Sequence, residues 1–427
     1  MADLPVLVVG AGPAGLMAAQ VLAESGRTVQ VYEQMPSAGR KFLRAGIGGL
    51  NLTHSEAADD FRQRYTPAQT VADWLQHLDA SDVRAWAAQL GIETFTGSSG
   101  RVFPVQKKAS PLLRAWLRRL LDLGVSLHTR HRWLGWEWQN TAGQQVQRHR
   151  FQTPHGVQHI EANACVLALG GGSWARLGSD GRWLSVLADA GVDVSDFAAS
   201  NCGFDYPWSN IMQQGFAGEP LKTVTLSLLL QDQVLFRRRG EALISRHGIQ
   251  GSVVYAASRL IQDNIAAHGA AHLCWDLMPD HDQSMIEARL SKARGKESLG
   301  NFLRKRLGLS PVKIALLREL APDRMVTPQM LAASIKALPM TVHQARPTDE
   351  AISTTGGVVL TQVDSRLMSN THPGVFFAGE MLDWDAPTGG YLLTACLASG
   401  KVAAEGVLNY SGAKSGHFAR DKRIEPD

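Results

Sequence analysis

The feature that most constrains this chain is an apolar strand that runs directly into a glycine-rich turn. Val6–Val9 leads into Gly10-Ala11-Gly12-Pro13-Ala14-Gly15, an alanine-rich helix follows, and a second apolar run, Val29–Tyr32, ends on Glu33. A strand, a G-x-G-x-x-G turn, a helix and a second strand that ends on an acid form the dinucleotide-binding βαβ unit. The N-terminal sequence therefore predicts a Rossmann-type α/β domain.

Each glycine of this turn has a physical role in the prediction. Gly10 makes the tight turn, Gly12 lets backbone N–H groups approach a pyrophosphate, and Gly15 lets the helix pack closely on the sheet. Glu33 lies at the distance expected for a carboxylate that accepts from a ribose hydroxyl, and its charge would repel a 2′-phosphate. The turn thus favours FAD or NAD, with a phosphate-free turn as the alternative.

The length and composition allow several domains and give no sign of a membrane or secretory segment. A chain of 427 residues that is 44% hydrophobic can bury more than one core, so we expect two or three domains. The first residues lack a basic n-region, and no apolar run is long enough to span a bilayer. We expect a cytoplasmic protein without a membrane partner.

The cysteines and the charge exclude several other classes. Cys165, Cys202, Cys274 and Cys396 are far apart and form no C-x-x-C pair, which argues against a disulfide framework, a zinc or other metal site and a redox dithiol. The formal net charge is only +4. The densest basic cluster, Arg237–Arg239, follows an alternating segment and is interpreted as a solvated strand end, so we expect no nucleic-acid partner.

A second glycine-rich segment, Gly39 to His54, follows the βαβ unit and contains Arg40, Lys41 and Arg44. Glycines beside basic residues suit a loop that approaches an anionic or planar ligand closely. We predict a ligand loop here, with an exposed flexible loop as the alternative.

Periodicity and capping signals predict the elements between the two ends of the chain. Val71 to Leu90 has a helical pattern, and alternation from Gly191 to Arg239 indicates a β-rich part. Two helix starts are predicted in a helical region, a capping box at Ser284 and Glu287 and a threonine cap at Thr327-Pro328.

Two further apolar strands end in glycine. Cys165–Leu169 leads into Gly170-Gly171-Gly172, and Val375–Phe377 leads through Ala378 into Gly379-Glu380. Strands that end at one sheet edge allow a long ligand to cross it, and FAD is long enough. Gly389-Gly390-Tyr391 then opens a helix whose N–H groups would point at the flavin N1/C2 side, unless the segment is a simple helix start.

Together these motifs resemble the HI0933-like bacterial flavoproteins of the two-dinucleotide-binding-domain type, the family that also contains aminoacetone oxidase. The resemblance covers nearly the whole chain and includes Gly100–Pro104, Gly240–Leu243 and Gly356–Val358. It implies an FAD domain made from both chain ends, an inserted β-barrel-like substrate domain and a small helical insert. The expected ranges are 1–190 with 345–427, 191–255 with 339–344, and 256–338.

The resemblance also implies roles for single residues. The adenosine pyrophosphate is expected at Gly10–Gly15, the ribose at Glu33, the isoalloxazine side at Arg40 and Lys41, and the ribityl-pyrophosphate side at Gly379, Glu380 and Asp383. The full expected cofactor set is Gly10, Gly12, Pro13, Ala14, Gly15, Glu33, Gly39, Arg40, Lys41, Ala168, Gly170, Gly171, Gly379, Glu380, Asp383, Gly389, Gly390 and Tyr391.

The chain departs from the family pattern at three places near the flavin or the substrate domain. Ala45–Asn51 lacks the usual arginine and cysteine, Ser245–Ser252 replaces Thr-His-x-Gly-Ile-Ser-Gly-Pro, and Leu392 stands where an asparagine often follows Gly-Gly-Tyr. The substrate of a characterised relative therefore cannot be transferred to this chain.

The function expected from the sequence is FAD-dependent hydride transfer to or from a small organic substrate, with NAD(P)H binding transiently or with oxygen as acceptor. Arg44, His54, Arg246 and His247 are the candidates for anion binding and proton transfer. The alternative is an FAD-binding protein with a structural, sensing or RNA-modification role.

Overall fold

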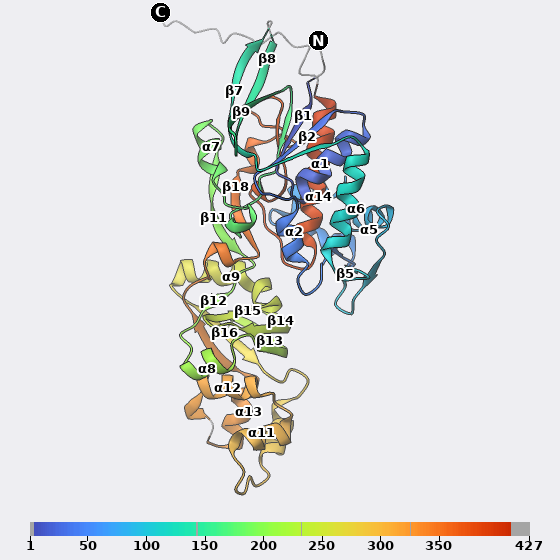
Figure 1. Cartoon of the computed structure of the whole chain (residues 1–427). Helices are drawn as coiled ribbons and strands as arrows, with labels where there is room; N and C mark the ends of the chain where they lie inside the picture. Colours follow the sequence, from blue (N-terminus) through green and yellow to red (C-terminus); the bar gives the residue numbers. More distant parts are fainter. Residues whose placement is uncertain (1–3, 142–143, 232, 325, 411–427) are drawn as a thin grey trace, which may run out of the picture. The chain divides into compact units, whose positions relative to one another are not determined.

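The computed structural model describes residues 4–141, 144–231, 233–324 and 326–410 (Figure 1). The chain divides into two compact units, residues 1–198 with 355–427 (unit 1) and residues 199–354 (unit 2). The chain passes from one unit to the other twice, and both boundaries fall inside strands, β11 (Val194–Ser200) and β18 (Ser353–Val358).

Unit 1 is built on a five-stranded parallel sheet in the order β19-β10-β1-β2-β6. Its strands are β1 (Val6–Val9), β2 (Val29–Glu33), β6 (Ser126–Thr129), β10 (Cys165–Leu167) and β19 (Val375–Phe377). Strand β1 pairs with β2 on one side and with β10 on the other, so the chain reverses its direction across the sheet at β1 and β10. In parallel sheets the crevice at such a reversal is where ligands bind.

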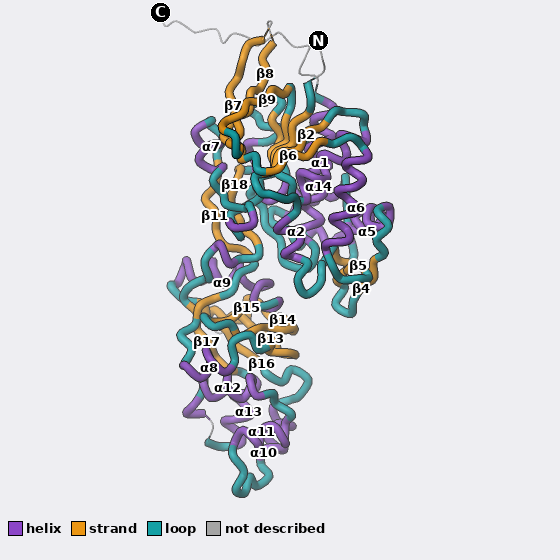
Figure 2. Tube along the Cα trace, in the orientation of Figure 1, coloured by secondary structure: helices purple, strands orange, loops and turns teal. Residues whose placement is uncertain are grey.

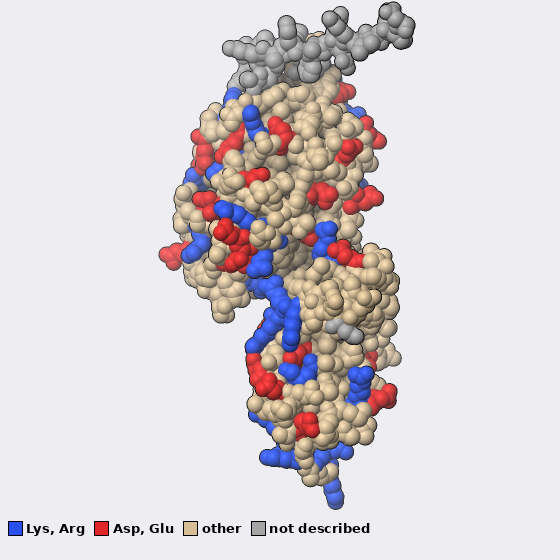
Figure 3. All heavy atoms as spheres, turned by 180° about the vertical axis from the view of Figure 1, so that it is seen from behind, with Lys and Arg blue, Asp and Glu red and all other residues tan. Residues whose placement is uncertain are grey.

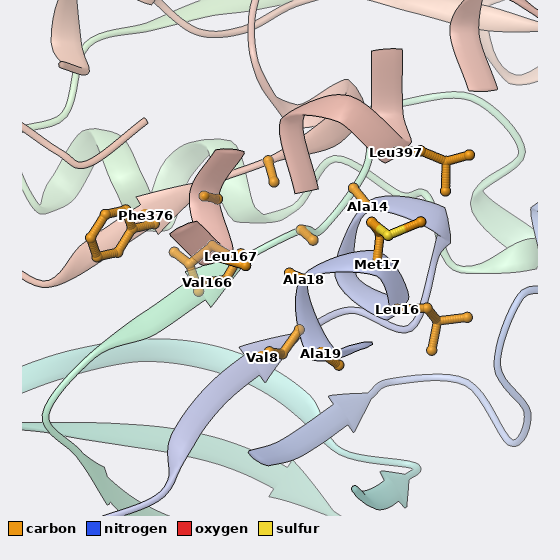
Figure 4. Close-up of a cluster of buried hydrophobic side chains, with 14 of the residues drawn as sticks. Val8, Ala14, Leu16, Met17, Ala18, Ala19, Val166, Leu167, Phe376 and Leu397 are labelled. Atoms are coloured by element: carbon orange, nitrogen blue, oxygen red, sulfur yellow. The ribbon is translucent and has the colours of Figure 1, made fainter. Parts of the chain in front are cut away.

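Two helices from opposite ends of the sequence lie side by side on this sheet, α1 (Pro13–Glu24) and α14 (Tyr391–Asn409). Small residues allow the close approach, since a Cβ on Gly400 would lie 2.3 Å from the Ala14 carbonyl oxygen. Figure 4 shows Ala14, Ala18 and Leu397 in the buried cluster between helices and sheet.

Helix α14 is the one helix in the described part of the chain that is long and apolar enough to cross a membrane. Its most apolar stretch is 67% buried inside the protein, as in a core helix.

Smaller elements complete unit 1 (Figure 2). An antiparallel sheet contains β7 (Arg132–Thr141), β8 (Gln144–Thr153) and β9 (Gly156–Ala162), and a second contains β3 (Thr53–His54), β4 (Thr94–Thr96) and β5 (Arg101–Pro104). The remaining helices are α2 (Arg40–Ala45), α3 (Ala58–Arg62), α4 (Ala68–Leu75), α5 (Ala80–Gln89), α6 (Ala109–Asp122), η1 (Ala175–Leu177), α7 (Trp183–Asp189), η4 (Leu360–Gln362) and η5 (Gly379–Met381).

Unit 2 has its own buried core around a six-stranded sheet in the order β12-β15-β14-β13-β16-β17. The strands are β12 (Phe204–Asp205), β13 (Pro220–Leu230), β14 (Gln233–Ile244), β15 (Gly248–Gln250), β16 (Ala271–Asp276) and β17 (Leu338–Val342). The helices are α8 (Asn210–Gly215), α9 (Ser252–His268), α10 (Gln283–Leu290), α11 (Leu299–Leu307), α12 (Pro311–Leu320), α13 (Pro328–Lys336), η2 (Pro322–Arg324) and η3 (Thr348–Glu350).

The predicted fold class is confirmed: the sequence of a Rossmann-type unit made from both chain ends is interrupted by a second unit with an antiparallel sheet and helices. The predicted three-part division into ranges stays a prediction. Strand β16 lies inside the range 256–338 expected for the helical insert, and it pairs with β13 and β17.

Several local predictions are corrected by the structure. The segment 71–90 forms two helices, α4 and α5, because the Asp79 side chain caps a new helix by accepting from the N–H groups of Ser81 and Asp82. Helix α10 starts after Asp282, so Ser284 is no cap. Arg237–Arg239 lies inside β14 and not at a strand end. The cap at Thr327 is confirmed, since its side chain accepts from Met330 N–H.

The surface carries both charge signs. On the face in Figure 3, acidic and basic side chains are interspersed over unit 1, at the top of the view.

Candidate dinucleotide site

A cavity in unit 1 lies where the carboxyl ends of β1, β10 and β19 meet. The turn after β1 lines it with Gly10, Gly12 and Ala14, the segment after β10 with Ala168 and Gly170, and the segment after β19 with Gly379 and Glu380. Three strands from distant parts of the sequence therefore deliver glycine-rich turns to one cavity, as the sequence predicts.

The turn between β1 and α1 shows why glycines are needed. A Cβ on Gly10 would lie 2.2 Å from the Ala168 carbonyl oxygen, and one on Gly15 would lie 1.9 Å from the Gly10 carbonyl oxygen. Gly15 is outside the cavity lining and serves packing. A Cβ on Gly12 would meet no atom within 4 Å, although Gly12 lines the cavity. Gly12 thus keeps space open for a ligand.

Glu33, at the end of β2, contacts the backbone of the glycine-rich turn. Its carboxylate accepts from the Ala11 N–H at 2.9 Å and from the Met35 N–H at 2.8 Å. Burial raises the pKa of Glu33 above the usual range, and the two backbone N–H groups and the charge of Arg40 oppose that rise. The residue lines the cavity, so a hydroxyl there can donate to it.

The structure corrects the first part of the loop predicted from Gly39 to His54. Residues 40–45 form helix α2, and Gly39 precedes it in the left-handed conformation with φ of 65°. Lys41 on this helix donates to Ser173 Oγ and to Glu380 Oε2, each at 2.7 Å. Lys41 therefore connects α2 to the segment that follows β19.

The structure separates the predicted cofactor set into two groups. Most of its members line the cavity, and the exceptions are Gly15, Gly171, Asp383, Gly389, Gly390 and Tyr391. Asp383 accepts from the Gly356 N–H at 2.9 Å and so anchors β18.

Tyr391 belongs to a polar and aromatic cluster with His54. The two rings stack with centroids 5.3 Å apart, and the Tyr391 hydroxyl donates to Glu56 at 2.6 Å. Arg64 pairs with the same carboxylate at 2.8 Å, and this contact holds the pKa of Glu56 below its usual range against the effect of burial.

Both nitrogens of the His54 ring face the backbone. Nδ1 accepts from the Glu56 N–H at 3.2 Å, and Nε2 lies 3.0 Å from the Ser99 carbonyl oxygen, which places the proton on Nε2. Burial lowers the pKa of His54. This geometry favours a packing role for His54, and its predicted role in proton transfer stays a prediction.

The four catalytic candidates fall in different units. Arg44 and His54 belong to unit 1, and Arg246 and His247 belong to unit 2. Within unit 2, Arg246 and His247 are exposed and line a hollow that also includes Arg346.

Part of the cavity wall was missed by sequence reasoning. His131, Arg132 and Trp133 at the start of β7 line it, as does the segment from Leu177 to Trp183. The sequence signal in the second segment is its pair of glycines, Gly178 and Gly181. Both have positive φ in a tight turn. Gln34 donates to the Gly178 carbonyl oxygen at 2.6 Å and fixes this turn beside β2.

Comparison with known proteins agrees with this architecture. The model of the HI0933-like protein Rossmann domain matches residues 4–406. The chain is similar to a 3-dehydro-bile acid delta(4,6)-reductase of Clostridium scindens, at 26% identity over 93% of this chain and 97% of the relative. It is also similar to a ribosomal RNA dihydrouridine synthase of Haemophilus influenzae, at 24% identity over 90% and 94%.

Among solved structures, the 3-ketosteroid delta1-dehydrogenase from Sterolibacterium denitrificans matches with a TM-score of 0.52 at 13% identity. This match covers 95% of this chain and 99% of that chain, and it shows a shared fold. The prediction of an oxidoreductase is confirmed at the level of the family, whose model covers nearly all of the described residues. The chain belongs to the HI0933-like family.

Proposed function

We propose that this protein is an FAD-dependent oxidoreductase that transfers a hydride between the flavin and a small organic substrate in the cytoplasm. The observation that carries the proposal is the cavity at the carboxyl ends of β1, β10 and β19, with the glycine turn at its wall.

The residues of the cavity fit a dinucleotide. Pro13, the first residue of α1, has no N–H, and the other N–H groups of the first turn have no partner within the helix. Among the described residues no side chain caps them, so they are available to phosphate oxygens. Arg40 lines the cavity, and its Nε is buried without a hydrogen-bond partner among the described residues. A buried donor without a partner is costly, and an anionic ligand would satisfy it.

Each wall then has a part in holding the cofactor. Gly12 and the start of α1 would hold the pyrophosphate, Glu33 a ribose hydroxyl, and Arg40 a phosphate or ring oxygen. When bound, FAD supplies the redox chemistry. Burial raises the pKa of the Cys396 thiol in the cavity wall to about 12, which favours the protonated thiol over the thiolate.

The relatives suggest which substrates to test first. One is named as a delta(4,6)-reductase and the other as a dihydrouridine synthase, and both names describe saturation of a carbon–carbon double bond. We therefore place compounds with a double bond conjugated to a carbonyl group ahead of amines as candidate substrates.

The experiment is an anaerobic titration of the purified protein after reconstitution with FAD. We expect a flavin spectrum that bleaches with NADH or NADPH and recovers on addition of a conjugated enone or enoate. Retained FAD that no donor reduces would contradict the oxidoreductase, and absence of flavin binding would contradict any FAD-dependent role.

A second candidate is an FAD-binding protein whose role is structural, sensing or linked to RNA modification. The similarity to the dihydrouridine synthase of Haemophilus influenzae favours the RNA arm of this alternative. A gel shift with ribosomal RNA and with tRNA separates it from the small-molecule enzyme, for which we expect no shift at physiological salt.

A further inference from the structure

Two arginines converge on one tryptophan beside the cofactor cavity. The Cζ atom of Arg44 lies 4.6 Å from the ring centroid of Trp174, and that of Arg176 lies 5.1 Å from it. Trp174 has φ of 62° and ψ of 53°, a left-handed conformation that is rare for a bulky side chain. Such strain persists where the surroundings hold a residue in place, and it is found preferentially at functional sites.

The charges of this cluster are not balanced. Neither Arg44 nor Arg176 forms an ion pair with an acidic side chain in the described ranges, and both side chains are exposed. A guanidinium stacked on an indole keeps its edge N–H groups available for hydrogen bonds to an anion. Two positive charges near one ring favour a ligand with negative charge.

Apolar side chains flank the same arginine. Leu43 is 38% exposed and Ile47 is 68% exposed, and the two lie on either side of Arg44 in the sequence. They are exposed apolar side chains on α2 and on the turn after it, in the same chain segment as Arg44. This combination suits a ligand that joins an anionic group to a flat or alicyclic apolar body.

The cluster is built from the same two segments as the cofactor cavity. Arg44 lies on α2, whose Lys41 donates to Ser173, the residue before Trp174. Arg176 lies on η1, and the cavity wall begins at Leu177 on the same short helix. A ligand on the cluster would therefore lie beside the cavity, all within unit 1.

We propose that Arg44, Trp174 and Arg176 form the binding site for an anionic group, a carboxylate or a phosphate, carried on a flat or alicyclic apolar body. The identification of this ligand as the reaction partner of a flavin depends on the proposed function. It assigns Arg44 to binding and adds Trp174 and Arg176, which sequence reasoning did not find. The carboxylate of an organic-acid substrate and the 2′-phosphate of NADPH share this chemistry.

Direct binding to the full-length protein tests the site with three probes, measured by isothermal titration calorimetry. Cinnamate carries the carboxylate, 2′,5′-ADP carries the phosphate, and cinnamyl alcohol is the neutral analogue of cinnamate. We expect at least one anionic probe to bind ten times more tightly than the alcohol. The anionic probe that binds more tightly shows whether the ligand of the site is an organic acid or a pyridine nucleotide.

Variants locate the binding. R44Q/R176Q should weaken the anionic probe at least tenfold and remove its preference over cinnamyl alcohol, and W174L should weaken all probes that bind. R118Q removes an exposed arginine on α6 of the same unit and should change nothing. Equal binding of anionic and neutral probes, no binding of any probe, or an equal loss in R118Q would overturn the inference.

The FAD content of the same preparations separates the two proposals. Protein that retains no FAD but binds an anionic probe through Arg44 and Arg176 would contradict the proposed function and support the site. Protein that retains FAD in every variant but does not discriminate between probes would contradict the site alone.

Discussion

At the residue scale, Gly12 has a backbone conformation that any amino acid can adopt, with φ of −84°, and open space in the Cβ direction. We therefore predict that Gly12→Val folds normally but loses FAD, because the valine side chain occupies the pyrophosphate path. Flavin absorbance after reconstitution and thermal melting of the apoprotein measure the two effects. Gly215→Val is the matched control, since its Cβ also meets open space outside the cavity, and it should retain FAD. Normal flavin content in Gly12→Val would refute the assignment of the turn.

Glu33 is the second residue on which cofactor binding depends. Its carboxylate holds the Ala11 N–H and faces the cavity, so Glu33→Ala removes both a loop anchor and an acceptor for a hydroxyl. We expect the Kd for FAD to rise about tenfold, which corresponds to about 1.4 kcal/mol. Equilibrium dialysis with FAD checks this. Glu24→Ala, which removes a surface partner of Arg119, should leave the Kd unchanged.

At the scale of elements, the start of α14 depends on Gly390. This glycine has φ of 103°, and a Cβ on it would lie 2.4 Å from the Cα of Thr53. Gly390→Ala should therefore lower the free energy of unfolding by about 3 kcal/mol, because positive φ and overlap with backbone both add to the cost. Gly269→Ala, with φ of 76° and open space, should cost about 1 kcal/mol. Denaturant titrations measure both, and equal losses would show that the contact with Thr53 is unimportant.

The sheet of β7, β8 and β9 has a buried histidine that predicts a pH dependence. His149 accepts from Trp133 Nε1 at 3.2 Å, and burial lowers its pKa to about 3. In the unfolded chain the His149 imidazole takes up a proton near pH 6.5, whereas in the folded protein it stays neutral down to about pH 3. The contribution of His149 to the free energy of unfolding is therefore complete above pH 6.5 and is lost as the pH falls toward 3. We expect a loss of about 2 kcal/mol between pH 7 and pH 5.

Denaturant titrations of the wild type at several pH values measure how steeply the free energy of unfolding falls with pH. His149→Gln should make this slope smaller, whatever its effect on stability at pH 7. His159→Gln, on the exposed part of β9, should keep it. The explanation fails if both variants keep the wild-type slope.

At the scale of the whole molecule, each unit has its own buried core. We predict that residues 199–354 expressed alone fold with a cooperative thermal transition. In the full chain, FAD at 100 times its Kd should stabilise unit 1 by about 2.7 kcal/mol and leave the transition of unit 2 in place. Differential scanning calorimetry of the fragment and of the full chain with and without FAD tests both statements. A fragment without a cooperative transition would show that unit 2 depends on unit 1.

The sequence by itself determined the βαβ unit, the glycine turns after β1, β10 and β19, and the family, because these depend on local patterns within short segments. Only the tertiary structure decided that Lys41 meets Glu380, that Tyr391 meets Glu56, and that Arg44 and Arg176 share Trp174. These contacts join residues that are up to 339 positions apart, so no local periodicity encodes them. The physical reason is that glycine permits a tight turn or a close approach of the backbone at its own position, whereas a side-chain contact depends on how distant elements pack.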